Sequence, residues 1–182
     1  MTTENIMLGS GKLYIVDYDP TSGIPADTAF EADANRLGLI KGGATLEYRP
    51  EEYEIRDDLY EVNKRFVISE EATFKSGILT WDITTLKNII AQGTYTDDST
   101  NHKRTLKLGG NGAREMKQYA IRFVHTEGDG TNKFRITMVC TASAGLTIAF
   151  NPDSETAVDA EFKALAHGSD GTQVIFEETY SA

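Results

Sequence analysis

The sequence is poor in the residues that support cross-linking and metal binding, and it lacks long apolar runs. Its 182 residues include one cysteine, one tryptophan, four prolines and three histidines. The lone Cys140 excludes an intrachain disulfide, fits a reducing cytoplasm, and is predicted to be a small buried hydrophobe. No apolar run approaches the roughly 18 residues of a membrane span, and residues 1–11 lack a signal-peptide pattern. We therefore expect a soluble protein that makes no contact with a membrane.

Signatures of catalysis are also missing. None of the histidines, His102, His125 and His167, has a second histidine or a cysteine at a metal-ligand spacing. No Gly-x-Ser-x-Gly elbow is present, and the stretch 9–12 lacks the spacing of a phosphate-binding loop. We expect no enzyme, no catalytic residue, no metal and no cofactor.

Two acidic stretches contain residue types found in catalytic or calcium sites. Glu70 and Glu71 are adjacent on a predicted strand, so they point to opposite faces and do not form an acid–base pair. Glu127 and Asp129 lie in a Gly-rich turn and have the ligand type that Ca²⁺ prefers, but calcium needs six to eight oxygen ligands. A tight hairpin turn is the simpler interpretation of 127–132.

Basic residues are in deficit. The chain has 28 acids against 18 bases, a net charge of −10, which argues against a conventional basic surface for nucleic acids. The acids concentrate in residues 47–61, which hold seven acids and two bases. These acids are either a solvated face and a polar turn, or a functional surface.

The dominant feature of the sequence is a predicted long hairpin, with strands at 44–56 and 61–81. Leu46 and Tyr48 are the apolar members of the first alternation, whereas Tyr53 and Ile55 are apolar after Pro50. This change of phase beside a proline predicts a bulge that keeps one face apolar while the strand bends. On the return strand, Val62, Phe66 and Ile68 are assigned to one face.

The rest of the chain predicts a mainly β fold. Asp82 is a candidate N-cap for a helix of about ten residues that carries Ile83, Leu86 and Ile90 and stops at Gly93. Residues 160–166 and 172–177 flank a hairpin turn signal at 168–171. Further strands are predicted at 13–16, 103–108, 119–124, 134–141 and 146–150. We predict one domain, 1–182, with two packed antiparallel sheets forming a β-sandwich or barrel, one flanking α-helix, and long loops at 17–38 and 94–118.

Three segments carry a resemblance to a known family: 40–48, 64–66 and 70–81, with Gly42-Gly43 before an acidic strand and Trp81 before a helix. This pattern resembles the major tail tube protein of tailed bacteriophages. The resemblance implies hexameric rings that stack into a tube, with an inner barrel built from hairpin strands of all six subunits. It implies double-stranded DNA passing through without specific binding, and a virion tail protein made in the host bacterial cytoplasm. Implied partners are a tail-tip or baseplate initiator, a tape measure protein, a tail terminator and, in contractile tails, a sheath.

The resemblance also assigns candidate roles to residues. Lumen-facing acids that repel DNA would be Glu47, Glu52, Glu54, Glu61 and Glu71. Contacts between subunits would come from an arm in the first long loop, with Ile24, Pro25, Phe30 and Leu37. A flexible insertion is the other interpretation of that loop.

Two alternatives to a phage tube stay open. The same fold serves the tube of a phage-derived bacteriocin or of a type VI-like secretion apparatus. A protein of another class, a monomeric β-barrel that binds a small ligand, needs an apolar interior cavity. Mass in solution discriminates the last alternative from the tubes.

Overall fold

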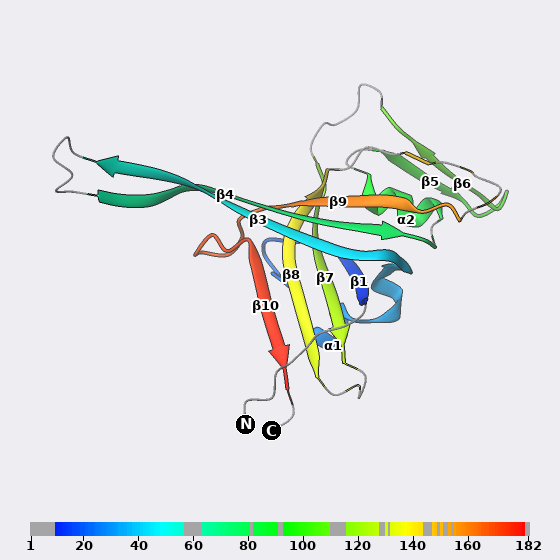
Figure 1. The fold of residues 1–182 in the computed structure, drawn as a ribbon. Coiled ribbons are helices and arrows are strands. Elements are labelled where there is room, and N and C mark those ends of the chain that lie inside the picture. Colours follow the sequence, from blue (N-terminus) through cyan, green and yellow to red (C-terminus); the bar gives the residue numbers. More distant parts are fainter. Residues whose placement is uncertain are drawn as a thin grey trace.

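The architecture comes from a computed structural model that describes residues 10–56, 63–80, 82–90, 93–109, 116–127, 130, 132–143, 147–148, 150, 153 and 155–180. This part of the chain is mainly β (Figure 1). Its helical elements are α1 (Asp27–Phe30), η1 (Asp33–Asn35, a 3₁₀ turn) and α2 (Ile83–Ile89). Its strands are β1 (Lys12–Asp17), β2 (Arg36–Gly38), β3 (Ile40–Arg56), β4 (Asn63–Ile78), β5 (Thr94–Asp98), β6 (Lys103–Lys107), β7 (Gln118–Thr126), β8 (Lys133–Ala142), β9 (Val158–Ala164) and β10 (Val174–Thr179).

Eight strands form one antiparallel sheet in the order β2-β1-β7-β8-β9-β4-β3, with β10 also paired to β8, and β5 and β6 form a separate pair. Strand β8 is the junction. Residues 133–138 of β8 pair with β10, whereas 140–142 pair with β9. The sheet therefore bends, and β3, β4 and β9 run across the direction of β1, β7 and β8 (Figure 1). Its path ends at β2 and β3, so the described strands do not close into a barrel.

The main core fills the angle of this bend. Phe74 and Phe162 come from the β4–β9 part, and Ile121 and Met138 come from β7 and β8; each is at most 1% exposed. Cys140 is buried among them, as predicted, and burial raises the pKa of its thiol. Alternation along each strand delivers these side chains to one face.

Helix α2 closes one end of this core. Asp82 accepts a hydrogen bond from the Thr85 N–H (2.8 Å), which confirms the predicted N-cap. Leu86 and Ile89 are buried. The helix is shorter than the predicted ten residues.

The opposite face of β1 and β7 is also covered, by residues 18–35, which we call the cover segment. Phe30 is fully buried there against Tyr14, Ala120 and Val124. The segment contains α1 and η1, where the sequence predicted a loop without regular structure, so the described residues contain two α-helices where one was predicted. Each of these elements is only about one turn long, which is too short to produce a periodic pattern in the sequence.

Three further expectations need correction. The long loop predicted at 94–118 contains β5 as well as β6, and β6 corresponds to the strand predicted at 103–108. The strand predicted at 146–150 is not found among the described residues. Ile148 packs on the core but belongs to no strand, and Leu146 lies outside the described residues. Strands β9 and β10 do not form a hairpin, since they share only the bridge between His167 and Thr172. Both pair instead with β8, β10 along residues 133–138 and β9 along residues 140–142.

Candidate functional site

The long hairpin of β3 and β4 is the most distinctive feature of the described chain. The strands have 17 and 16 residues, well beyond the common five or six. Strand β9 supports β4 only from Thr73 to Ile78. Beyond that point the hairpin continues as two strands, points away from the body (Figure 1), and all of residues 63–71 are exposed. Near the base of this outer part, Gln173 Nε2 donates a hydrogen bond to the Glu70 carbonyl (2.9 Å).

The predicted bulge exists at the expected level, but its extra residue is in the other strand. Glu51 pairs with Ser69 and Glu52 pairs with Val67, so Ile68 of β4 is the additional residue. Strand β3 therefore keeps its alternation through Pro50. The prediction of one continuous apolar face is wrong, because Leu46 and Tyr53 have opposite parity on an unbroken strand.

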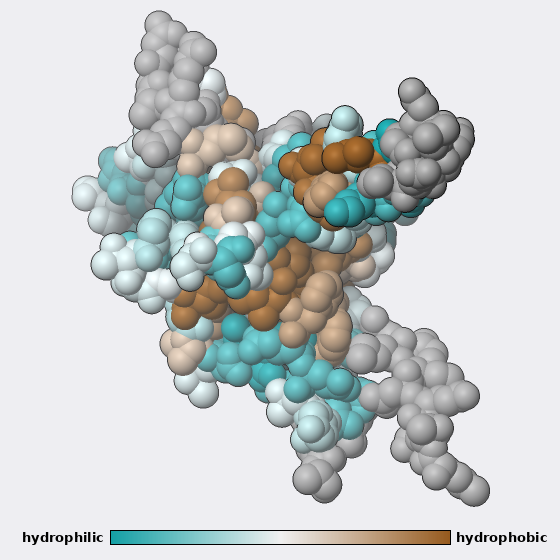
Figure 2. All heavy atoms as spheres, turned by 90° about the vertical axis from the view of Figure 1, so that its left-hand side faces the viewer, coloured by the Kyte–Doolittle hydropathy of each residue, from teal (hydrophilic) through white to brown (hydrophobic). Residues whose placement is uncertain are grey.

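Apolar side chains on the outer hairpin are consequently left in solvent. Tyr53 and Phe66 face each other across the strands and are 56% and 51% exposed. Ile68, at the bulge, is 60% exposed. Figure 2 views the hairpin from its tip towards the body and shows hydrophobic residues gathered on it, with a second hydrophobic band below across the body. Such contiguous exposure is unusual for a surface without a partner.

The candidate lumen acids do not share one face. Glu47 pairs with Thr73, and Glu71 pairs with Arg49, so both project from the side of β3–β4 opposite the core. Glu52 and Glu54 occupy the alternate positions of β3, so they point to the opposite face of the hairpin from Glu47. Glu61 lies outside the described residues.

Glu47 and Glu71 belong to a surface with equal numbers of acids and bases. Arg49 pairs with Glu47, Lys163 Nζ lies 2.9 Å from Glu71 Oε1, and Lys75 Nζ lies 3.2 Å from Glu161 Oε2. A hydrogen bond from Lys163, together with the nearby charge of Arg49, lowers the pKa of Glu71. We call these six residues the ion-pair face: Glu47, Arg49, Glu71, Lys75, Glu161 and Lys163.

Two of these six residues, Glu161 and Lys163, could not be placed on this surface from the sequence alone. They are more than 80 residues away in sequence from the hairpin partners they contact. The pairing of β9 with β4 shows what they face.

A second unpredicted feature is a buried charge cluster beneath the cover segment. Arg122 is 3% exposed and donates to Asp27 Oδ1 (2.6 Å) and Thr137 Oγ1 (2.9 Å). Arg135 donates to Glu31 Oε1 (2.6 Å). The Arg122 guanidinium also lies 4.6 Å from the centre of the Phe30 ring. One sequence signal could have indicated this cluster: Arg122 lies between Ala120 and Val124 on one face of β7, and both of these neighbours are buried.

This cluster bears on the candidate arm. Phe30 and Leu37 are 0% and 2% exposed, so their side chains are occupied within their own subunit. Ile24 is partly buried against the apolar cluster that contains Phe30, and Pro25 is half-buried. A contact between subunits made by this segment would therefore use its exposed residues instead of these side chains.

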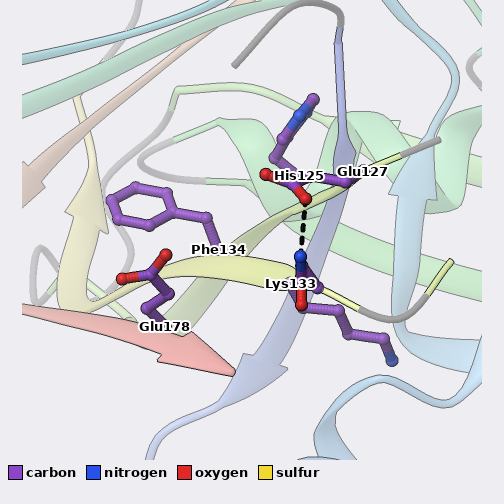
Figure 3. A pocket seen from close by; sticks show the side chains of 6 residues that line it. His125, Glu127, Lys133, Phe134 and Glu178 are labelled. Atoms are coloured by element: carbon purple, nitrogen blue, oxygen red, sulfur yellow. Dashed lines mark hydrogen bonds between the residues drawn. The ribbon is translucent and has the colours of Figure 1, made fainter. Parts of the chain in front are cut away.

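The described residues offer no catalytic constellation that we recognise. Figure 3 shows a small cleft at the end of β7 and β8, where Phe134 and Glu178 lie on one side and His125 and Glu127 on the other. Three of its polar groups are bonded within the chain: His125 Nδ1 is 2.8 Å from the Ser10 carbonyl, and Asn132 donates to Glu127 (2.7 Å). Within the described residues no group of three or more His, Cys, Asp or Glu could hold a metal ion. In the same part of the chain, no helix is long and apolar enough to cross a membrane.

No protein-family model matches this chain, and no curated protein sequence matches it. Its function must therefore be argued from the hairpin and the surfaces around it.

Proposed function

We propose that the chain is a structural, non-enzymatic subunit that assembles with copies of itself into stacked hexameric rings. These rings form the tube of a bacteriophage tail, through which the genome passes. The number six, the tube and the tail derive from the sequence resemblance. Self-assembly is supported independently by the shape of the subunit.

The observation that carries the proposal is the outer hairpin. An isolated two-stranded hairpin is marginally stable in water, and a third strand or a packed face is needed to support it. The described chain supplies neither beyond Thr73, while Tyr53 and Phe66 stay about half exposed. Burying the exposed half of each ring would contribute about 1 kcal/mol per ring. A neighbouring copy of the subunit provides the missing support.

The open sheet edges point to the same conclusion. Strand β3 is an edge strand of 17 residues, and long free edges readily pair with other chains. Pro50 interrupts the donors of that edge, which limits unselective pairing. In the proposed tube, the inner barrel is completed between subunits, in keeping with a sheet that stays open in one chain.

Two alternatives are separated by specific observations. The tube of a bacteriocin or of a type VI-like apparatus needs the same subunit shape, so the cargo distinguishes it from a phage tube. A monomeric ligand-binding barrel needs a closed sheet around an apolar chamber. Here the described sheet is open, and Phe74, Phe162 and Met138 fill its bend.

The test is negative-stain electron microscopy over a concentration series, with particle masses measured in parallel. We expect rings of six subunits and hollow tubes from the unaltered chain. The variant Tyr53→Thr/Phe66→Thr keeps strand-forming residues but removes both rings, and we expect it to stay monomeric with an unchanged circular dichroism spectrum. The control Tyr53→Phe/Phe66→Tyr keeps the aromatic area and should assemble.

Two results would contradict the proposal. One is a monomer at every concentration, with and without the tail-tip complex as initiator. The other is normal tube assembly by the double threonine variant, which would remove the hairpin from the interface.

A further inference from the structure

The ion-pair face has a regular arrangement of opposite charges. Across the strands, Arg49 lies opposite Glu71, and Lys75 lies opposite Glu161. Each of the three bases is within ion-pair distance of one of the three acids. Three positive and three negative charges cancel, although the chain as a whole carries −10.

Stability is an insufficient reason for this arrangement. The Lys75 and Lys163 side chains are 54% and 52% exposed, and Arg49 is 73% exposed. Pairs this exposed contribute between zero and about 1 kcal/mol each. Uncharged, β-branched residues such as the central Thr73 would form these strands equally well.

The pairing has a stronger effect on how the face meets a polyanion. An unpaired lysine or arginine binds a phosphate and releases a counterion. A base already held by a carboxylate must first leave it, and the carboxylate then repels the phosphate. Glu71 lies between Arg49 and Lys163, so it screens two bases at once.

We infer that the three carboxylates of the ion-pair face keep its three bases from binding nucleic acid, so that a duplex passes this face without being held. The inference rests on the proposed function for the identity of the passing polyanion. The core side of the same strands is covered by Leu46, Phe74 and their neighbours. A channel wall built from β3, β4 and β9 therefore presents the ion-pair face to its contents. On this face the candidate lumen acids Glu47 and Glu71 are each paired with a base.

The test measures binding of a fluorescent 20-base-pair DNA duplex to the full chain by anisotropy, at concentrations where the chain is monomeric. We expect no binding by the unaltered chain at 50 mM or 200 mM NaCl. The variant Glu47→Gln/Glu71→Gln/Glu161→Gln frees three bases and should bind at 50 mM. With three phosphate contacts, its affinity should fall about 40-fold by 200 mM.

A matched control separates pairing from net charge. Asp33→Asn/Asp98→Asn/Glu178→Gln removes the same number of carboxylates, none of which forms an ion pair with another described residue. It should bind no better than the unaltered chain. If the triple glutamine variant loses its fold, Glu71→Gln/Glu161→Gln frees two lysines and should show about a 12-fold loss over the same salt range.

Three outcomes overturn the inference: binding by the unaltered chain, equal binding by the control, or no binding by a folded glutamine variant. Because the assay uses monomers, it is independent of tube formation. Failure to form tubes would remove the proposed function and leave the measured masking of the bases intact.

Discussion

Replacing Arg122 tests whether the buried charge cluster stabilises the packing of the cover segment on the sheet. The Arg122 side chain is 4% exposed and bonded to Asp27, while Glu31 and Glu177 each have an oxygen 3.6 Å from it. Methionine has a similar length and keeps the packing on Phe30, so Arg122→Met removes mainly charge and hydrogen bonds.

The expected cost follows from what the substitution leaves behind. Removing one partner of a buried ion pair costs about 3–5 kcal/mol, because the other charge stays buried. Here Asp27 is half exposed and Glu31 keeps its 2.6 Å bond from Arg135, so the low end applies. We expect a loss of about 3 kcal/mol, which for a chain of this size lowers Tm by about 6–12 °C.

The assay is urea unfolding of the monomer, followed by circular dichroism, with a thermal melt in parallel. The control is Arg104→Met, which removes an arginine with a 52% exposed side chain that lies 3.5 Å from Asp82. That exposed pair should contribute less than about 1 kcal/mol. The double variant Arg122→Met/Asp27→Asn should cost less than the sum of its single substitutions, because the stranded carboxylate is gone. Equal losses for Arg122→Met and Arg104→Met would refute the reasoning.

Two further predictions concern acid and backbone geometry. The hydrogen bond from Arg122 lowers the pKa of Asp27 from its ordinary 3.8, so the stability it contributes is complete above that value and is lost as pH falls through the lower folded-state value. The difference in unfolding free energy between the unaltered chain and Asp27→Asn should be constant near neutral pH and disappear in acid; a difference that grows in acid would contradict the assignment. Gly38 has φ +150°, and an added Cβ would lie 2.5 Å from the Thr80 carbonyl oxygen, whereas Gly109, at φ +79°, has open space. Gly38→Ala should therefore lower stability by about 1–3 kcal/mol more than Gly109→Ala in thermal melts, and equal losses would exclude the close contact.

Local signals predicted the elements of this fold well. The alternation of Tyr119, Ile121 and Phe123 gave β7, and Asp82 gave the start of α2. Both signals act between residues close in sequence, so a single sequence contains the information.

Non-local contacts explain the errors. Phe30 stands in no periodic pattern because it is buried against Ala120 and Val124, which lie 90 or more residues later in the chain. The sequence predicted the extra residue of the hairpin bulge in the strand of Pro50, whereas the structure has it in the other strand, at Ile68. Register is fixed by both strands together, and one strand's pattern cannot show which of the two contains the insertion.

The alternation of β3, which continues unbroken past Pro50, also explains why the apolar side chains of the outer hairpin stay exposed. A strand that stays apolar on one side can be buried by one body, and the inner part of the hairpin achieves this with Leu46 and Phe74 against the core. Past Pro50 the apolar residues Tyr53 and Ile55 have the opposite parity, so the same body cannot cover both sets. The described chain leaves the outer set exposed, so the surface that covers it must come from outside this body. Under the proposed function, a neighbouring subunit supplies that surface.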